Sequence, residues 1–246
     1  MIKLNRNSTP ILLSPIFVKD KTQEFKDTGN SVWNIDWLKE SLLSLSDDKC
    51  AYCECDLKEE SKYMEVEHFE DKDSYPDKVL EWDNLLPSCK RCNGSKSTHD
   101  VIAEPIINPF TDYPSTHIYF RLYRMKEKDE KGRQTIDVVN LNHYERAVQK
   151  RFEVGEALEK LIDTASERIA LYIESSIVQR RNKLKNIVED ILKECQPSTI
   201  YSATCATVLH TNETYSKIKE TLIKLGLWDD YFEYLDNVSK AIILLR

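Results

Sequence analysis

Two Cys-x-x-Cys pairs constrain this chain more than any other feature of its sequence. Cys50 and Cys53 form the first pair, and Cys89 and Cys92 form the second. Each pair can offer two thiolates to one tetrahedral ion, and four thiolates favour zinc among the common intracellular metals. A closed four-thiolate site leaves no position for water. We therefore expect a structural Zn²⁺ that joins two distant segments of the chain.

The ligand set has alternatives. Cys55 lies two residues after Cys53 and offers a competing thiol. The two pairs could also be unrelated cysteines, or one of them a redox pair, although two such pairs seldom occur together without a metal. Cys195 and Cys205 lie in helical sequence, and we expect them to be small buried apolar residues.

Composition and charge exclude several classes of protein. The chain of 246 residues carries 35 Lys+Arg against 42 Asp+Glu, a net charge of −7, which argues against a free-standing basic module for nucleic acid. Its apolar stretches are far shorter than the roughly 20 residues of a membrane span, and its first residues form no signal-peptide pattern. We expect a globular cytoplasmic protein.

The apolar pattern predicts a mostly helical fold. Only 5 Gly and 8 Pro occur in the chain, whereas Leu, Ile, Lys and Glu are abundant. A short strand is expected between Tyr63 and Phe69. Residues 117–125 and 134–141 predict a β-hairpin on a polar loop. Helical spacing is found at 31–46, from His143 onward, and at 184–192, 211–225 and 229–245.

These elements predict an α+β fold that is mostly α, in four segments. An N-terminal arm and helix cover residues 1–46, and a zinc-framed core covers 47–110. The hairpin segment covers 111–142, and a helical domain that resembles a bundle covers 143–246.

Chemically useful side chains lie between and beside the cysteine pairs. Glu67 and His68 are adjacent, Asn84 follows, and Asn93 comes directly after the second pair. A histidine beside a carboxylate, with two amides nearby, suits the hydrolysis of a phosphodiester. The histidine can activate water, and the oxygen atoms can bind a divalent ion.

These residues resemble the HNH nuclease family, whose ββα-metal core is often framed by a zinc site. The resemblance implies that His68 is the general base, that Glu67 and Asn93 bind one Mg²⁺ or Mn²⁺, and that Asn84 orients His68. It also suggests Lys96 as a nucleic-acid contact. The matching text is CAYC (50–53), VEH (66–68), EWDNLLPSCKRCN (81–93) and Lys96.

The sequence departs from the family pattern at two positions. Asn93 stands where the family name implies histidine, and Glu67 stands where aspartate is common, which bears on the metal preference. His99 is the rival of Asn93 for the third motif position. His117, His143 and His210 have no partner pattern and are expected to be structural.

The predicted core is acidic. Residues 50–100 hold 13 Asp+Glu against 7 Lys+Arg, so this segment should repel phosphates. Residues 117–151 hold 9 basic residues against 5 acidic ones, and residues 179–185 are also basic. These segments could form a groove that follows a nucleic-acid backbone. The second of them could equally be a solvated helix face.

Residues 30–165 resemble the PtuB-type HNH subunits of Septu anti-phage systems and of some retrons. The resemblance rests on the HNH motifs, on INPF (107–110) and on DVVNLN (137–142) before a long helix. It implies a defence nuclease with a PtuA-like ATPase partner and a nucleic-acid substrate, DNA being favoured. An effector that cuts RNA, such as a transfer RNA, and a zinc-stabilised binding module with a vestigial HNH site are the alternatives.

Overall fold

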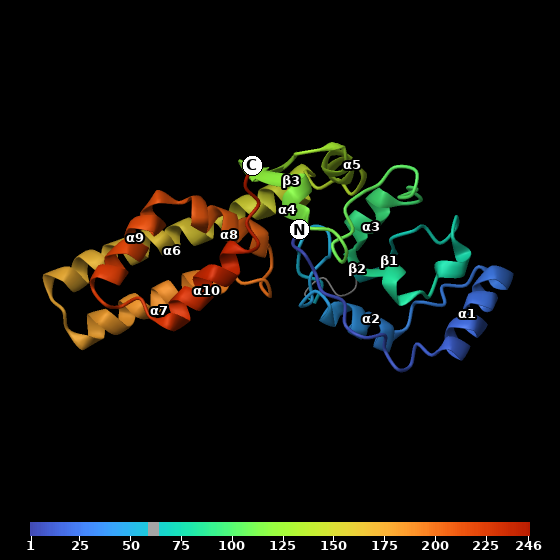
Figure 1. Ribbon diagram of the computed structural model, residues 1–246, viewed down its shortest axis with the longest axis horizontal. Helices are drawn as coiled ribbons and strands as arrows, with labels where there is room; N and C mark the ends of the chain where they lie inside the picture. The colour runs from blue at the N-terminus through green and yellow to red at the C-terminus, as the bar shows by residue number, and fades with distance from the viewer. Residues whose placement is uncertain (59–63) are drawn as a thin grey trace. The chain divides into compact units, whose positions relative to one another are not determined.

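The computed structural model describes residues 1–58 and 64–246, and it divides into two compact units. The first unit contains residues 1–119 and 124–143, and the second contains residues 120–123 and 144–246. The described residues are mostly helical, with two small two-stranded sheets (Figure 1). This confirms the predicted fold class, whereas the finer division into four segments remains a prediction. No described helix combines the length and apolarity that a bilayer crossing requires.

The centre of the first unit is a ββα arrangement. Strand β1 (Met64–His68) pairs antiparallel with β2 (Leu85–Cys89), and helix α3 (Lys90–Lys96) follows β2 without a break. Two 3₁₀ turns, η2 (Pro76–Lys78) and η3 (Trp82–Asn84), lie between the strands. The expected short strand is confirmed, although Tyr63, its first predicted residue, lies outside the described residues. The register pairs His68 with Leu85, so the HNH-type histidine lies at the end of the sheet opposite Cys89.

Two helices precede this core. Helix α1 (Pro15–Thr28) begins after Ser14, whose side chain accepts a hydrogen bond from the Phe17 N–H, and it ends at Gly29 with φ +71°. Its one buried residue is Thr22, so α1 lacks the apolar stripe by which a helix is recognised in sequence.

Helix α2 (Asp36–Ser44) is shorter than the helical pattern at 31–46 predicted. Ile35 has extended backbone angles, and residues before it form turns. Trp33 therefore lies on a turn ahead of the helix.

The predicted hairpin is wrong in its second strand. Strand β3 (Ile118–Arg121), which follows the short helix α4 (Pro114–His117), pairs with β4 (Arg124–Glu127). The segment at 134–141 belongs mainly to helix α5 (Glu130–Val138). The Asp129 side chain accepts a hydrogen bond from the Gly132 N–H, and this N-cap starts a helix despite the β-branched residues that follow.

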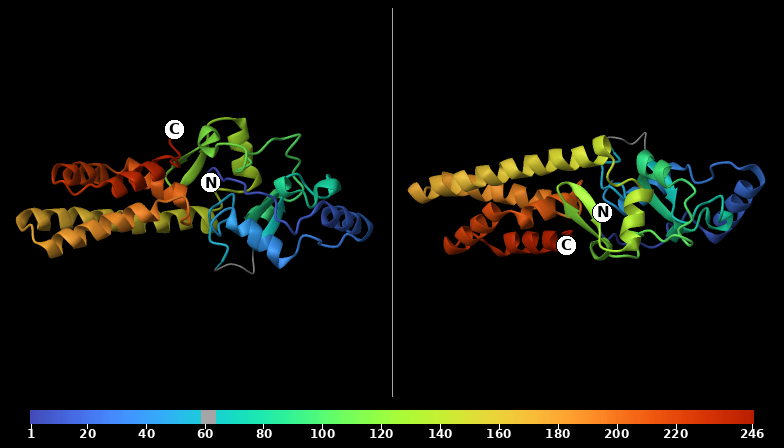
Figure 2. Two further views of the ribbon diagram at one scale, coloured as in Figure 1. Left: turned by 60° about the horizontal axis from the view of Figure 1, so that its bottom comes forward. Right: turned by 90° about the horizontal axis from the view of Figure 1, so that it is seen from above.

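Residues 144–246 of the second unit are all-α, as predicted for the C-terminal hundred residues. A π-helical turn, η4 (Tyr144–Val148), leads into α6 (Gln149–Glu174). Helix α7 (Val178–Glu194) lies beside α6 (Figure 2). The remaining helices are α8 (Ser202–Thr211), α9 (Glu213–Lys224) and α10 (Asp230–Lys240).

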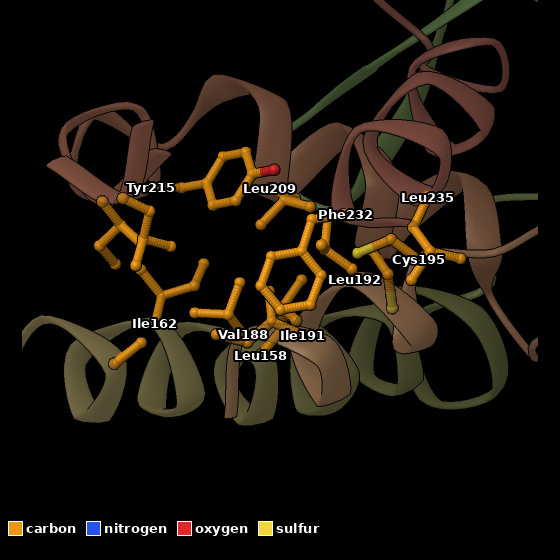
Figure 3. Packing of buried hydrophobic residues seen from close by; sticks show 14 of the residues in the cluster. Leu158, Ile162, Val188, Ile191, Leu192, Cys195, Leu209, Tyr215, Phe232 and Leu235 are labelled. Atoms are coloured by element: carbon orange, nitrogen blue, oxygen red, sulfur yellow. The ribbon is translucent and has the colours of Figure 1, made fainter. Parts of the chain in front are cut away.

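The core of this second unit is formed by aliphatic and aromatic side chains from these helices (Figure 3). Cys195 and Cys205 lie within it, 0% and 1% exposed, as expected for small apolar residues. Helix α8 was not predicted, because eight of its ten residues are buried and it shows no polar face.

Candidate active site

Four buried cysteines form a closed cluster beside the ββα sheet. The sulfur atoms of Cys50, Cys53, Cys89 and Cys92 all lie within 4.8 Å of one another. A tetrahedral ion with metal–sulfur bonds of about 2.3 Å requires sulfurs roughly 3.8 Å apart. The Sγ atoms of Cys53 and Cys89 are 3.8 Å apart. The cluster therefore fits a structural four-cysteine metal site, with the ligand set predicted from the spacing.

Backbone hydrogen bonds bring the two cysteine pairs together. The Ala51 N–H donates to the Pro87 carbonyl of β2 at 2.9 Å, which fixes the first pair against the second strand. Cys89 is the N-cap of α3, and its sulfur accepts a hydrogen bond from the Cys92 N–H. Cys55, the competing thiol, is partly exposed and lies outside the four-cysteine group.

Tyr52 connects this metal site to the HNH-type residues. It lies between the two cysteines of the first pair and is fully buried. Burial, together with the nearby Glu67 carboxylate, raises the pKa of its phenol. The metal site therefore does more than join two segments, because it also places a phenol against Glu67.

The imidazole of His68 has a defined tautomer. Its Nε2 lies 3.0 Å from the Val79 carbonyl oxygen. Because a carbonyl can only accept a hydrogen bond, the proton is on Nε2 and Nδ1 keeps its lone pair. Burial lowers the pKa of His68 to about 4, so the ring is neutral at pH 7. A neutral imidazole with a free Nδ1 lone pair can accept a proton, as a general base must.

Glu67 lies beside His68 as a buried carboxylate. Its Oε1 lies 2.8 Å from the ammonium Nζ of Lys96, and both side chains are 1% exposed. Burial raises the pKa of Glu67 to about 7, although Lys96 opposes the shift. A second positive charge would stabilise the ionised form of Glu67, because Lys96 alone does not offset the loss of hydration.

Lys96 does not occupy the surface position that a nucleic-acid contact requires. Besides its ion pair with Glu67, its Nζ donates to the His68 carbonyl at 2.9 Å. The side chain is buried at the end of α3, where it joins that helix to β1. The sequence suggested Lys96 as a nucleic-acid contact, and the structure corrects this, because Lys96 is a buried partner of Glu67.

Asn84 contacts the backbone that surrounds His68. Its Oδ1 accepts from the Glu70 N–H at 2.7 Å, and its Nδ2 donates to the Glu70 and Lys78 carbonyls. Lys78 is next to Val79, whose carbonyl binds the His68 ring. Asn84 thus holds both chain segments that fix the imidazole.

Asn93 lies opposite a carboxylate that sequence analysis did not single out. Its Nδ2 donates to Oε2 of Glu65. Glu65 precedes Glu67 by two residues on β1, so both side chains emerge on the same face of the strand. This period of two is the signal in the sequence that could have identified Glu65.

A cavity of about 310 Å³ brings these groups together. Asp71, 4% exposed, is a further carboxylate in its lining. Oxygen donors of this kind are the ligands that Mg²⁺ and Mn²⁺ prefer. The lining also includes Trp33 and Lys39 from the N-terminal segment, which no local motif predicted. The predicted site residues that line the cavity are Glu67, His68 and Asn93.

The remaining histidines lie elsewhere. His99, the rival of Asn93, contacts the Glu104 carbonyl through Nε2 and does not line the cavity. His117 pairs with Asp129 at 2.6 Å, and His210 contacts Ser239 at 2.7 Å within the second unit. Both contacts are structural, as expected.

The sequence is similar to known proteins over its whole length. Residues 50–99 match the family of HNH endonucleases. The chain is 46% identical to the Septu protein PtuB of Bacillus thuringiensis over 249 residues, covering 99% of this chain and 96% of that protein. It is 27% identical to the Septu protein PtuB of Bacillus mycoides (strain KBAB4), covering 92% and 94%.

Proposed function

Since the chain belongs to the Septu PtuB family and carries an HNH endonuclease domain, we propose that it is the nuclease of an anti-phage defence system. Its reaction is the metal-dependent hydrolysis of phosphodiester bonds in nucleic acid. The observation that carries this proposal is the neutral, oriented His68 in a cavity that oxygen donors also line. A zinc-stabilised binding module would not need this combination.

His68 acts as the general base in this proposal. With its Nε2–H held by the Val79 carbonyl, Nδ1 takes a proton from the water that attacks phosphorus. Asn84 is a positioning residue, because its Nδ2 donates to the carbonyl of Lys78, next to Val79. Both residues keep the roles that the resemblance implied.

The donor set fits one hard divalent cation. Glu67 and Asn93 would hold Mg²⁺ or Mn²⁺, and Glu65 is placed to join them because it contacts Asn93. When bound, the ion supplies positive charge that stabilises the phosphorane-like transition state and the leaving oxygen. Zn²⁺ is the ion proposed for the four cysteines, since closed sulfur coordination suits a structural role.

An ATPase of the PtuA type is the proposed partner. The acidic core makes unaided binding of a polyanion unfavourable, so another subunit should deliver the substrate. The second unit has exposed apolar residues where α6 ends and α7 begins, among them Ile173, Ile177 and Val178. Groups of exposed apolar side chains are typical of protein–protein interaction sites, and we assign docking of the ATPase to this end of α6 and α7.

One assay separates the candidate functions. The purified chain is incubated with plasmid DNA and with total RNA, each with Mn²⁺ or with a chelator, and with or without a PtuA-type ATPase. The proposal expects cleavage only with the metal ion, and faster cleavage with the ATPase. Cleavage confined to RNA would identify the RNA-cutting alternative. Absence of cleavage under all conditions, with nucleic acid still bound, would favour the binding module.

A further inference from the structure

The cavity that contains His68 has a wall from a distant part of the chain. Residues 31–39, between the end of α1 and the first turn of α2, contribute Ser31, Trp33, Asn34 and Lys39 to the lining. None of these belongs to an HNH motif. The segment therefore adds side chains to the site that the motif alone does not supply.

Trp33 contacts the candidate general base directly. Its ring centroid lies 4.7 Å from that of His68, with an angle of 81° between the planes. Trp33 also makes an edge contact with Phe25 of α1, with the centroids 5.6 Å apart. The indole is thus held by α1 while it packs against the imidazole, and it excludes water from one side of that ring.

The lining of the cavity contains two cations. They are Lys39 on α2 and Lys72 in the segment after β1. The Nζ of Lys72 lies 6.0 Å from the centroid of Trp33 and 3.4 Å from Oδ2 of the exposed Asp73. Lys39 has no carboxylate partner among the described residues. Lys96 is not available to substrate, since it is buried against Glu67.

An acidic core that acts on a phosphodiester needs positive charge at its entrance. We propose that Lys39 and Lys72 bind the phosphate backbone of the nucleic-acid strand beside the scissile bond, while Trp33 holds the imidazole of His68 in place. This inference rests on the proposed nuclease function. It assigns to Lys39 and Lys72 the substrate contact that the sequence had suggested for Lys96.

The phosphate contacts are tested by binding. Lys39→Gln and Lys72→Gln are made in full-length His68→Ala protein, so that the probe stays intact, with Lys19→Gln on the exposed face of α1 as the matched control. Fluorescent duplex DNA and single-stranded RNA oligonucleotides are titrated from about 50 mM salt upward. Each cavity variant should bind the preferred probe about three- to tenfold more weakly, with a salt slope lower by about 0.7 to 0.9. Lys19→Gln should match the parent.

The positioning role is tested by kinetics in protein with an intact His68. Trp33→Ala should lower kcat by about ten- to a hundredfold with little change in KM, because a misplaced base still allows substrate to bind. Trp33→Phe keeps an aromatic edge and should recover most of the rate. Metal content and melting temperature are measured alongside, since a loss of folding would alter both.

The outcomes distinguish this inference from the proposed function. Cavity lysine variants that bind with the affinity and salt slope of Lys19→Gln would overturn the phosphate contact. A Trp33→Ala protein with wild-type kcat, or one that Trp33→Phe does not rescue, would overturn the positioning role. If the wild-type chain binds the probe without cutting it, the proposed nuclease function is wrong. The binding measurements still test whether Lys39 and Lys72 contact phosphate. If no probe binds at about 50 mM salt even with the PtuA-type ATPase present, both ideas fail.

Discussion

At the scale of single residues, the ion pair between Glu67 and Lys96 determines how the candidate active site is charged. Both side chains are 1% exposed, so neither charge is hydrated. A buried pair of this kind contributes little net stability, but removal of one partner leaves the other charge without compensation. The buried carboxylate is therefore placed to bind a cation, and its burial raises its pKa to about 7.

The Glu67 carboxyl should set the acid limb of activity. As pH falls through about 7, Glu67 takes up a proton and loses affinity for the metal ion, whereas His68 stays neutral until pH approaches about 4. A plot of log kcat/KM against pH should therefore bend near 7 at low Mn²⁺. Higher Mn²⁺ should move the bend to lower pH, because the metal competes with the proton. A bend independent of metal concentration would assign the limb to another group.

Lys96→Met should destabilise the protein by about 3 to 5 kcal/mol, because Glu67 is left buried without its cation. The double variant Glu67→Gln/Lys96→Met should recover part of that loss. Urea unfolding in the absence of divalent ions measures both. If Lys96 instead contacts nucleic acid, the single variant should unfold like the wild type and bind nucleic acid with a lower salt slope.

At the scale of elements, the cysteine site joins segments that have few regular contacts of their own. Strands β1 and β2 have five residues each, and a two-stranded sheet is marginal by itself. The metal site closes a loop from Cys53 to Cys89 and buries Tyr52 against Glu67, so it stabilises the sheet and places the carboxylate. Loss of the metal should therefore affect both stability and catalysis.

Metal analysis should find about one zinc per chain, and Cys50→Ser or Cys92→Ser should lose it and lower the melting temperature. Cys55→Ser should keep the metal, because Cys55 lies outside the four-cysteine group. Cys205→Ala, in the second unit, should also keep it and lose only packing energy. Loss of zinc from Cys55→Ser would show that the ligand assignment is wrong.

Local patterns predicted the parts of the structure that depend on local spacing. The cysteine ligands and the Glu67-His68 pair lie in short motifs, so sequence located them. Trp33 and His68 are 35 positions apart, and their contact depends on where α1 and α2 pack, which no periodicity reveals. The β-propensity of residues 134–141 predicts a strand, whereas the N-cap at Asp129 starts a helix there.

At the scale of the whole molecule, the net charge bears on how nucleic acid reaches the candidate active site. The chain has a net charge of −7, and its core segment is acidic, so encounter with a polyanion is electrostatically unfavourable. The second unit has its own apolar core and presents apolar side chains where α6 ends and α7 begins. The proposed division between a nuclease unit and a partner-binding unit accounts for both features.

The proposed docking surface is tested with single substitutions in the full-length chain. Ile173→Glu and Ile177→Glu, at residues 60% and 51% exposed, should abolish co-purification with the ATPase, because each buries a charge in an apolar interface. Ile223→Glu on α9, at 54% exposed, is the matched control and should co-purify normally. Equal retention of the ATPase by all three variants would place the docking surface elsewhere.

The central claim is that His68 is the base of a metal-dependent nuclease. The most direct measurement is the single-turnover rate of nucleic-acid cleavage with Mn²⁺, for the wild-type chain and for His68→Ala, both with the proposed PtuA-type ATPase. The account predicts that His68→Ala cuts about 10² to 10⁴ times more slowly while its zinc content and melting temperature stay close to wild type. A His68→Ala protein that is folded, retains zinc and cuts at the wild-type rate would contradict it.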